Sequence, residues 1–341
     1  MKIAHSPKSK SIISFSYGLV LAAWVLSSWA SAGDATLSYA IAEGTSYVGV
    51  PLLREAVLKG RINSVVAPDR LQVTLSEHSA LSSALNYYLE ITSAPQTPDL
   101  EGERFNLWSA SLREIVPAST QIHLHLGHFD NTRGDLPAAL TGCDFVVRPH
   151  WTLSSLFGGQ DRPSLLRGHR LISASDQVTF QRGTAVFTYF LETSPSHPHG
   201  RWKSTRGGVL HDPILGPGSA LMLNRKKGLL RFTLTGEKRS TLLRRPLLAG
   251  QNLVSLPSLK ASRIVDLVLT AEQGWAPEDM LTIWKGPSKR RYQWTSPTDG
   301  WIGLDSILGM DPAVAPIFSP TSGIMITKKT ADPDFALRPV P

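Results

Sequence analysis

An internal duplication constrains the fold of this chain more than any other feature of its sequence. The matching blocks, all at an offset of 103 positions, are residues 151–156 with 254–259, 176–180 with 279–283, Tyr189 with Tyr292, and 217–226 with 320–329. Matches in one register over about 80 residues predict two copies of one structural unit, because self-similarity at a fixed period is typical of repeated modules.

A fainter copy of the same pattern lies near the start of the chain. Residues 44–51 resemble residues 250–257, at twice the offset of the main repeat. The match stops after Pro51, so we expect this segment to share only an opening strand with the two copies.

The composition between these blocks favours strands over helices. Gly (27) and Pro (24) are frequent, and short β-branched runs lie between them, as in chains built of strands and turns. In the N-terminal part, residues 57–66 and 69–74 flank an Ala-Pro-Asp turn and predict a hairpin. We therefore expect a mainly β fold, with a small N-terminal barrel or sandwich followed by two duplicated β-sandwich-like modules.

The expected domain organisation follows from these patterns. In chain order the segments are a signal peptide (1–32), an N-terminal β module (33–147), repeat copy 1 with a connecting hairpin (148–247), repeat copy 2 (248–330) and a loose tail (331–341). Asp176 and Asp279 are equivalent in the two copies, which indicates a turn or strand cap in each.

The first 32 residues have the pattern of a secretory signal. Lysines at positions 2, 8 and 10 precede an apolar stretch that ends at Trp29, and Ala30-Ser31-Ala32 follows as a cleavage site. Cleavage after Ala32 leaves Gly33 first, whereas an uncleaved segment would anchor the chain in a membrane. We expect an exported protein of the periplasm, the cell surface or the exterior.

Charge and cysteine content exclude some classes of function. Removing the signal removes three lysines and no acid, so the net charge of +8 falls to +5, too small to predict nucleic-acid binding. Cys143 is the single cysteine, so no intrachain disulfide can form, and we expect it to be a buried side chain.

Three blocks of the sequence resemble an uncharacterised family of exported bacterial proteins, known chiefly from verrucomicrobial genomes. They lie at residues 48–65, 148–157 and 217–222, and the most specific is Arg148-Pro149-His150-Trp151-Thr152-Leu153. The chain departs from the family pattern at His150 and in the histidine-rich strand at residues 121–126. The resemblance implies export and architecture only, because no activity is established for the family.

The sharpest candidate for chemistry is the string that contains His123, His125 and His128. In a strand, His123 and His125 project to one face, where two imidazoles can share a zinc ion. The string resembles the His-x-His-x-Asp-His motif of metallo-β-lactamase-type hydrolases, but Gly127 replaces the aspartate. The alternative is a solvent-exposed strand face, with Leu124 and Leu126 buried and no cofactor bound.

Tryptophans in the repeated modules suggest a second kind of site. Aromatic faces exposed on a β-sandwich can stack on sugar rings. Trp202 and Trp301 are the best candidates, because each lies next to a polar or Gly-rich loop. The alternative is that these side chains pack in the core.

The sequence therefore favours an exported, non-catalytic β protein that acts by surface binding or assembly, with envelope or extracellular polysaccharide as the expected partner. The alternative is an extracytoplasmic metal-dependent hydrolase that uses His123, His125 and His128 with zinc. A membrane contact is expected only through an uncleaved signal, and the sequence leaves the oligomeric state open.

Overall fold

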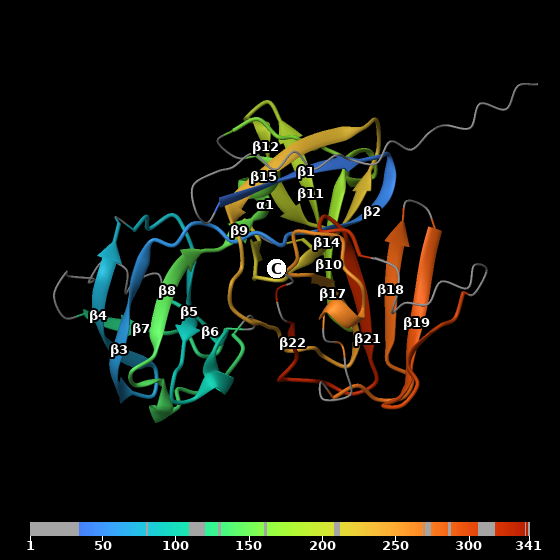
Figure 1. Ribbon diagram of the computed structural model, residues 1–341. Helices are drawn as coiled ribbons and strands as arrows, with labels where there is room; N and C mark the ends of the chain where they lie inside the picture. Colours follow the sequence, from blue (N-terminus) through green and yellow to red (C-terminus); the bar gives the residue numbers. More distant parts are fainter. Residues whose placement is uncertain are drawn as a thin grey trace, which may run out of the picture.

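The structure is a computed structural model that describes residues 34–339, except 80, 109–119, 129–130, 160–161, 208–211, 268, 270–273, 286–287, 306–317 and 338. The predicted signal segment lies outside these residues. The fold is mainly β, as the sequence predicts, and every strand pairing in the described part of the chain is antiparallel. A barrel lies on the left of Figure 1, and the strands of two repeated modules lie above it and to its right.

The six-stranded sheet closes into a small N-terminal barrel. In sheet order its strands are β6 (Arg104–Asn106), β5 (Tyr87–Ser93), β8 (Asp144–Pro149), β3 (Leu58–Ala67), β4 (Arg70–His78) and β7 (Thr120–His123). Just beyond β6 and β7, Leu107 bridges Leu124, and the backbone N–H of His125 donates to the Asn106 carbonyl at 2.7 Å. These contacts join the two edge strands, so the N-terminal module is a barrel and not a sandwich.

Alternation of side chains fills this barrel. On β3, Leu58, Gly60 and Ile62 point inward, while the residues between them are exposed. The predicted hairpin is present, because Ala67 pairs with Arg70 around a turn at Pro68 and Asp69. Cys143 is buried in the same core, as expected.

The duplicated modules share one ten-stranded sheet. Module 1 contributes β2 (Gly44–Gly49), β10 (Gln177–Gly183), β11 (Ala185–Ser194), β12 (His197–Ser204) and β14 (Ala220–Arg225). Module 2 contributes β17 (Gly250–Ser255), β18 (Met280–Lys285), β19 (Ser288–Ser296), β20 (Gly300–Gly303) and β21 (Gly323–Lys328).

Strand pairing in the two modules repeats with the offset found in the sequence. Val178 pairs with Tyr189 on one side and Leu223 on the other, and 103 positions later Leu281 pairs with Tyr292 and Ile326. The modules are therefore equivalent in strand order and in register.

The opening strand of module 1 is β2, which lies before the barrel in the chain. β2 pairs with β14 as β17 pairs with β21: Gly49 faces Ala220, and Ser255 faces Gly323. The weak sequence match at residues 44–51 thus marks the missing first strand of copy 1. The barrel is an insertion between β2 and the rest of module 1. The expected N-terminal module, which begins at residue 33, therefore wrongly includes β2, a strand that belongs to module 1.

Residues 151–156 match the opening strand of module 2 in sequence, but they do not form the opening strand of module 1. β9 (Trp151–Thr152) pairs with β13 (Ile214–Leu215), outside the large sheet, and continues into the short helix α1 (Leu153–Phe157). Other short helical turns among the described residues are η1 (Pro98–Leu100), η3 (Ala138–Leu140), η4 (Ile172–Ala174) and η5 (Val265–Leu267).

Two expectations about connecting segments are wrong. Residues 229–246 do not form a hairpin: β15 (Leu230–Glu237) pairs with β1 (Asp34–Ile41), and β16 (Leu243–Arg244) pairs with β22 (Ala336–Leu337). The expected loose tail contains β22, because Phe335 and Leu337 are buried in the core of module 2. Each module thus has a small second layer over its sheet, β1–β15 for module 1 and β16–β22 for module 2.

The two modules meet about an approximate two-fold axis. The backbone N–H of Gly49 in module 1 donates to the Thr321 carbonyl of module 2 at 2.9 Å. The equivalent N–H of Ser255 in module 2 donates to the Gly218 carbonyl of module 1 at 2.8 Å. Reciprocal contacts of this kind are typical of two-fold symmetric interfaces.

The equivalent aspartates Asp176 and Asp279 are structural caps, as predicted. Both are fully buried, and Oδ1 of each accepts a backbone N–H, from Lys226 at 2.7 Å and from Lys329 at 2.8 Å. A cation accompanies each one: Arg225 lies 3.6 Å from Asp176, and Lys328 Nζ lies 2.7 Å from Asp279.

Buried arginines join the barrel to the modules. Arg104 of the barrel donates to the Pro217 carbonyl at 3.0 Å and to the Arg244 carbonyl at 2.7 Å. Arg239, in the segment after β15, pairs with the buried Glu90 of β5. These contacts fix the inserted barrel beside the ten-stranded sheet.

Candidate functional site

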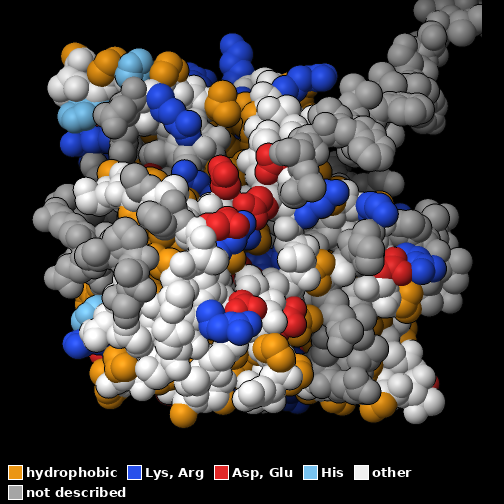
Figure 2. Space-filling view, turned by 60° about the vertical axis from the view of Figure 1, so that its left-hand side comes forward, with side chains coloured by type: hydrophobic (Ala, Val, Ile, Leu, Met, Phe, Trp, Pro, Cys, Tyr) orange, Lys and Arg blue, Asp and Glu red, His pale blue; other side chains and the backbone are white. Residues whose placement is uncertain are grey.

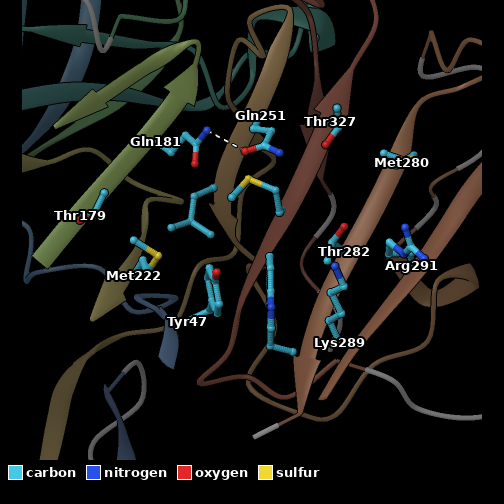
Figure 3. A pocket seen from close by; sticks show the side chains of 13 residues that line it. Tyr47, Thr179, Gln181, Met222, Gln251, Met280, Thr282, Lys289, Arg291 and Thr327 are labelled. Carbon is cyan, nitrogen blue, oxygen red and sulfur yellow. Dashed lines mark hydrogen bonds between the residues drawn. The ribbon is translucent and has the colours of Figure 1, made fainter. Parts of the chain in front are cut away.

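A cleft lies on the face of the ten-stranded sheet where the two modules meet. Its volume is about 280 Å³. It is lined by Tyr47 of β2, Thr179 and Gln181 of β10, Met222 of β14, Gln251 and Leu253 of β17, Met280, Thr282 and Trp284 of β18, Lys289 and Arg291 of β19, and Met325 and Thr327 of β21. Figure 3 shows these side chains gathered from strands of both modules.

Strand alternation selects these side chains. On β14, Leu221 and Leu223 point into the core of module 1, while Met222 between them points into the cleft. On β18, Leu281 and Ile283 point into the core of module 2, and Thr282 points into the cleft. One face of the shared sheet therefore makes the cores, and the opposite face makes the cleft.

An aromatic stack forms one wall of the cleft. The rings of Tyr47 and Trp284 lie 3.5 Å apart between centroids, with an interplanar angle of 13°. Tyr47 comes from module 1 and Trp284 from module 2, so the stack holds the modules together on this side. Burial in the stack raises the pKa of the Tyr47 hydroxyl.

An amide pair lies at the other end of the cleft. Gln181 Nε2 donates to Gln251 Oε1 at 2.8 Å, across the junction where β10 pairs with β17 (Figure 3). Between the amide pair and the aromatic stack, Met222, Leu253 and Met325 pack together as an apolar floor.

The charged groups of the cleft all come from β19. Arg291 Nη2 donates to Asp305 Oδ1 at 2.7 Å, which raises the pKa of Arg291 and lowers that of Asp305. Lys289 is exposed and makes no ion pair with an acid in the described part of the chain. The cleft is thus positively charged on the side of module 2.

The lining of the cleft combines aromatic, hydroxyl, amide and cationic side chains. No lining residue is an aspartate, glutamate, histidine or cysteine among those that the structure describes. The cleft therefore lacks a carboxylate pair or an imidazole, the usual groups for general acid–base catalysis. It offers two aromatic rings, hydroxyls and amides for hydrogen bonding, and a cation.

The expectation that Trp202 and Trp301 are exposed is wrong. Trp202 is 0% exposed and Trp301 is 8% exposed. The two are equivalent in the modules: Trp202 pairs with Leu191 and Trp301 with Trp294, so both point to the core face. Each indole Nε1 donates to a backbone carbonyl at 3.1 Å, that of Gly158 for Trp202 and that of Leu269 for Trp301. Neither ring can stack on a sugar.

The histidine strand lies on the outside of the barrel. Ile122 and Leu124 are buried, and His123 and His125 lie on the opposite, partly exposed face. His125 stacks on Trp108 with centroids 3.9 Å apart, and His128 meets the edge of His125 at 5.5 Å. Among the described residues no group of three or more His, Cys, Asp or Glu is arranged to hold a metal ion.

Differences between the two copies are the signal that could have located the cleft from sequence. Trp284 has Gln181 as its equivalent in copy 1, Lys289 has Val186, and Arg291 has Thr188. Trp202 and Trp301, in contrast, occupy equivalent positions and serve the fold in both copies. Residues that break the repeat on a shared sheet face are the better candidates for a ligand site.

Comparisons with known proteins found no match to a family model, to a curated protein or to a solved structure. No helix among the described residues is long and apolar enough to span a membrane. On the face shown in Figure 2, basic and acidic side chains lie close together near the middle of the view and do not form one basic surface.

Proposed function

We propose that this chain is exported and acts outside the cytoplasm as a non-catalytic binding protein that holds a segment of polysaccharide in the cleft between its two modules. The observation that carries the proposal is the Tyr47–Trp284 stack beside a row of hydroxyl and amide groups. Aromatic faces pack against the apolar face of a sugar ring, and hydroxyls and amides bind its hydroxyl groups.

The size of the cleft fits a short segment of chain. Its volume of about 280 Å³ is close to the lower limit of about 300 Å³ for small-molecule sites. The cleft is also partly open to solvent, as binding of a polymer requires. The secretory signal at residues 1–32 supports a polymer of the envelope or the exterior as the partner.

Co-sedimentation of the mature chain, residues 33–341, with envelope and extracellular polysaccharide tests this proposal. We expect the polysaccharide to retain the wild-type chain and Trp108→Ala, and to release Trp284→Ala. Trp108 is a suitable control because it is 47% exposed on the barrel, away from the cleft. Failure of the wild-type chain to bind, or equal loss in both variants, would contradict the proposal. Sedimentation of the chain without polysaccharide would favour assembly instead.

A further inference from the structure

We propose that the ligand of this cleft is an acidic polysaccharide, whose anionic group binds Lys289 while a sugar ring packs beside Trp284. This inference rests on the proposed function and adds the chemical class of the ligand. It follows from the position of Lys289, from the charges around the cleft and from the difference between the two modules.

Lys289 and Trp284 are direct neighbours across the β18–β19 hairpin. They form one pair in the strand register, so their side chains leave the sheet on the same face. Both line the cleft, and Tyr47 of module 1 packs on Trp284. A sugar ring beside Trp284 therefore places its substituents within reach of the Lys289 ammonium group.

The charges of the cleft favour an anion. Lys289 and Arg291 both line it, and no carboxylate does so among the described residues. Arg291 is held by Asp305, whose pKa it lowers through its hydrogen bonds, and Lys289 contributes less to that shift. Lys289, Arg291 and Asp305 together carry one net positive charge. Arg291 pairs with Asp305, whereas Lys289 forms no ion pair with a described acid.

The repeat shows that these cations are not part of the module fold. In module 1 the positions of Lys289 and Arg291 are occupied by Val186 and Thr188, and the strand pairing is unchanged. The fold thus does not require a cation at either position. A cleft with one neutral and one positive half binds a ligand in one orientation, with its anionic group toward module 2.

Titration calorimetry with matched ligands tests this inference. The probes are an oligogalacturonate, which carries one carboxylate on each sugar, and the same oligomer with its carboxylates methyl-esterified. Lys289→Gln is compared with Lys238→Gln, which removes the same charge at an exposed position outside the cleft. A sulfated oligosaccharide in a parallel titration shows whether the site prefers carboxylates or accepts any anionic sugar.

The wild-type chain should bind the acid more tightly than the ester. Lys289→Gln should weaken binding of the acid about 3- to 10-fold and leave the ester unchanged, because an exposed ion pair contributes little and a charge-assisted hydrogen bond contributes more. Lys238→Gln should bind both ligands like the wild type. Equal affinity for acid and ester, or equal losses in both lysine variants, would overturn the inference and leave polysaccharide binding intact. Failure of the wild type to bind any of the oligomers would overturn the inference, and the co-sedimentation experiment decides the proposed function separately.

Discussion

Tyr47 and Trp284 stack face to face, although Tyr47 belongs to the first strand of module 1 and Trp284 to module 2. On the other side of the cleft, the modules are joined by backbone pairing between β10 and β17. The stack thus links the two modules and also forms the aromatic wall of the cleft. The proposed binding and the module contact therefore depend on the same pair of rings.

This double role predicts a measurable coupling between the two rings. In a double-mutant cycle of Tyr47→Ala and Trp284→Ala, the free energies of unfolding should be non-additive by about 0.5–1.5 kcal/mol, the usual contribution of an aromatic pair. Tyr47→Ala with Trp108→Ala should be additive, because Trp108 lies on the barrel. Urea unfolding followed by circular dichroism measures both cycles, and additive effects for Tyr47 and Trp284 would contradict the stacking.

The approximate two-fold axis predicts a tight packing constraint at Gly323. A Cβ added there would lie 2.8 Å from the Cβ of Ala220, its equivalent in module 1. We expect Gly323→Ala to lower the free energy of unfolding by about 1–3 kcal/mol through overpacking.

A compensating change provides the control for this constraint. Ala220→Gly in the Gly323→Ala background moves the methyl group to the other module and should recover much of the loss, although glycine in a strand has its own cost. Thermal unfolding of the two single variants and the double variant tests the axis. No recovery in the double variant would show that the two sites do not meet.

Neutralising each of two buried glutamates of the barrel should change stability by different amounts, because their pKa values are shifted in opposite directions. Burial alone would raise the pKa of Glu90, but the charge of Arg239 and the Thr241 hydroxyl outweigh it and hold the pKa below the ordinary value of 4.5. For Glu103, burial prevails over the Thr132 hydroxyl and the nearby arginines, and its pKa is raised. Glu90→Gln should therefore cost about 3–5 kcal/mol at pH 7 by leaving Arg239 buried without its partner, and Glu103→Gln should cost less than about 1 kcal/mol.

The pH dependence of stability follows from the same shift. A carboxylate with a lowered pKa stabilises the folded state above pH 4.5, and this contribution is lost as the pH falls through the lowered pKa. Chemical unfolding should be measured between about pH 3 and pH 7, which brackets the ordinary carboxyl pKa. The free energy of unfolding should fall more steeply with decreasing pH in the wild type than in Glu90→Gln. The same pH dependence of the free energy of unfolding in both proteins would show that Glu90 does not contribute to it.

The proposed export predicts a defined N-terminus. Mass spectrometry of the chain purified from outside the cytoplasm should find Gly33 as its first residue, because cleavage follows the Ala-x-Ala site. Ala32→Arg should block processing and leave the full-length chain on the membrane. A mature chain that still begins at Met1 would contradict the predicted cleavage.

The sequence predicts the repeated modules well because their backbone register is the same in both copies. The equivalence of Asp176 and Asp279 predicts a cap in each copy for that reason. Asp176 accepts the backbone N–H of Lys226, directly after β14, and Asp279 accepts that of Lys329, directly after β21. The place of β2 was harder to predict, because the inserted barrel separates it from its partner β14 by well over a hundred residues.

Local sequence patterns did not reveal the candidate site, because the site depends on which face of the sheet is covered. Trp202 and Trp284 both lie in strands with alternating patterns, and their local sequence does not distinguish core from cleft. Trp202 faces the second layer made by β1 and β15, whereas Trp284 faces the open side of the sheet. Only the three-dimensional arrangement of the two modules brings Tyr47 to Trp284.

The most direct test of the account is a nitrogen–proton NMR titration that follows the tryptophan indole N–H signals during addition of oligogalacturonate. The Trp284 signal, assigned by its loss in Trp284→Phe, should shift in a saturable way. The buried indoles of Trp202 and Trp301, which donate to backbone carbonyls, should stay in place. Shifts at Trp108 with none at Trp284 would place the ligand on the barrel and contradict binding in the cleft.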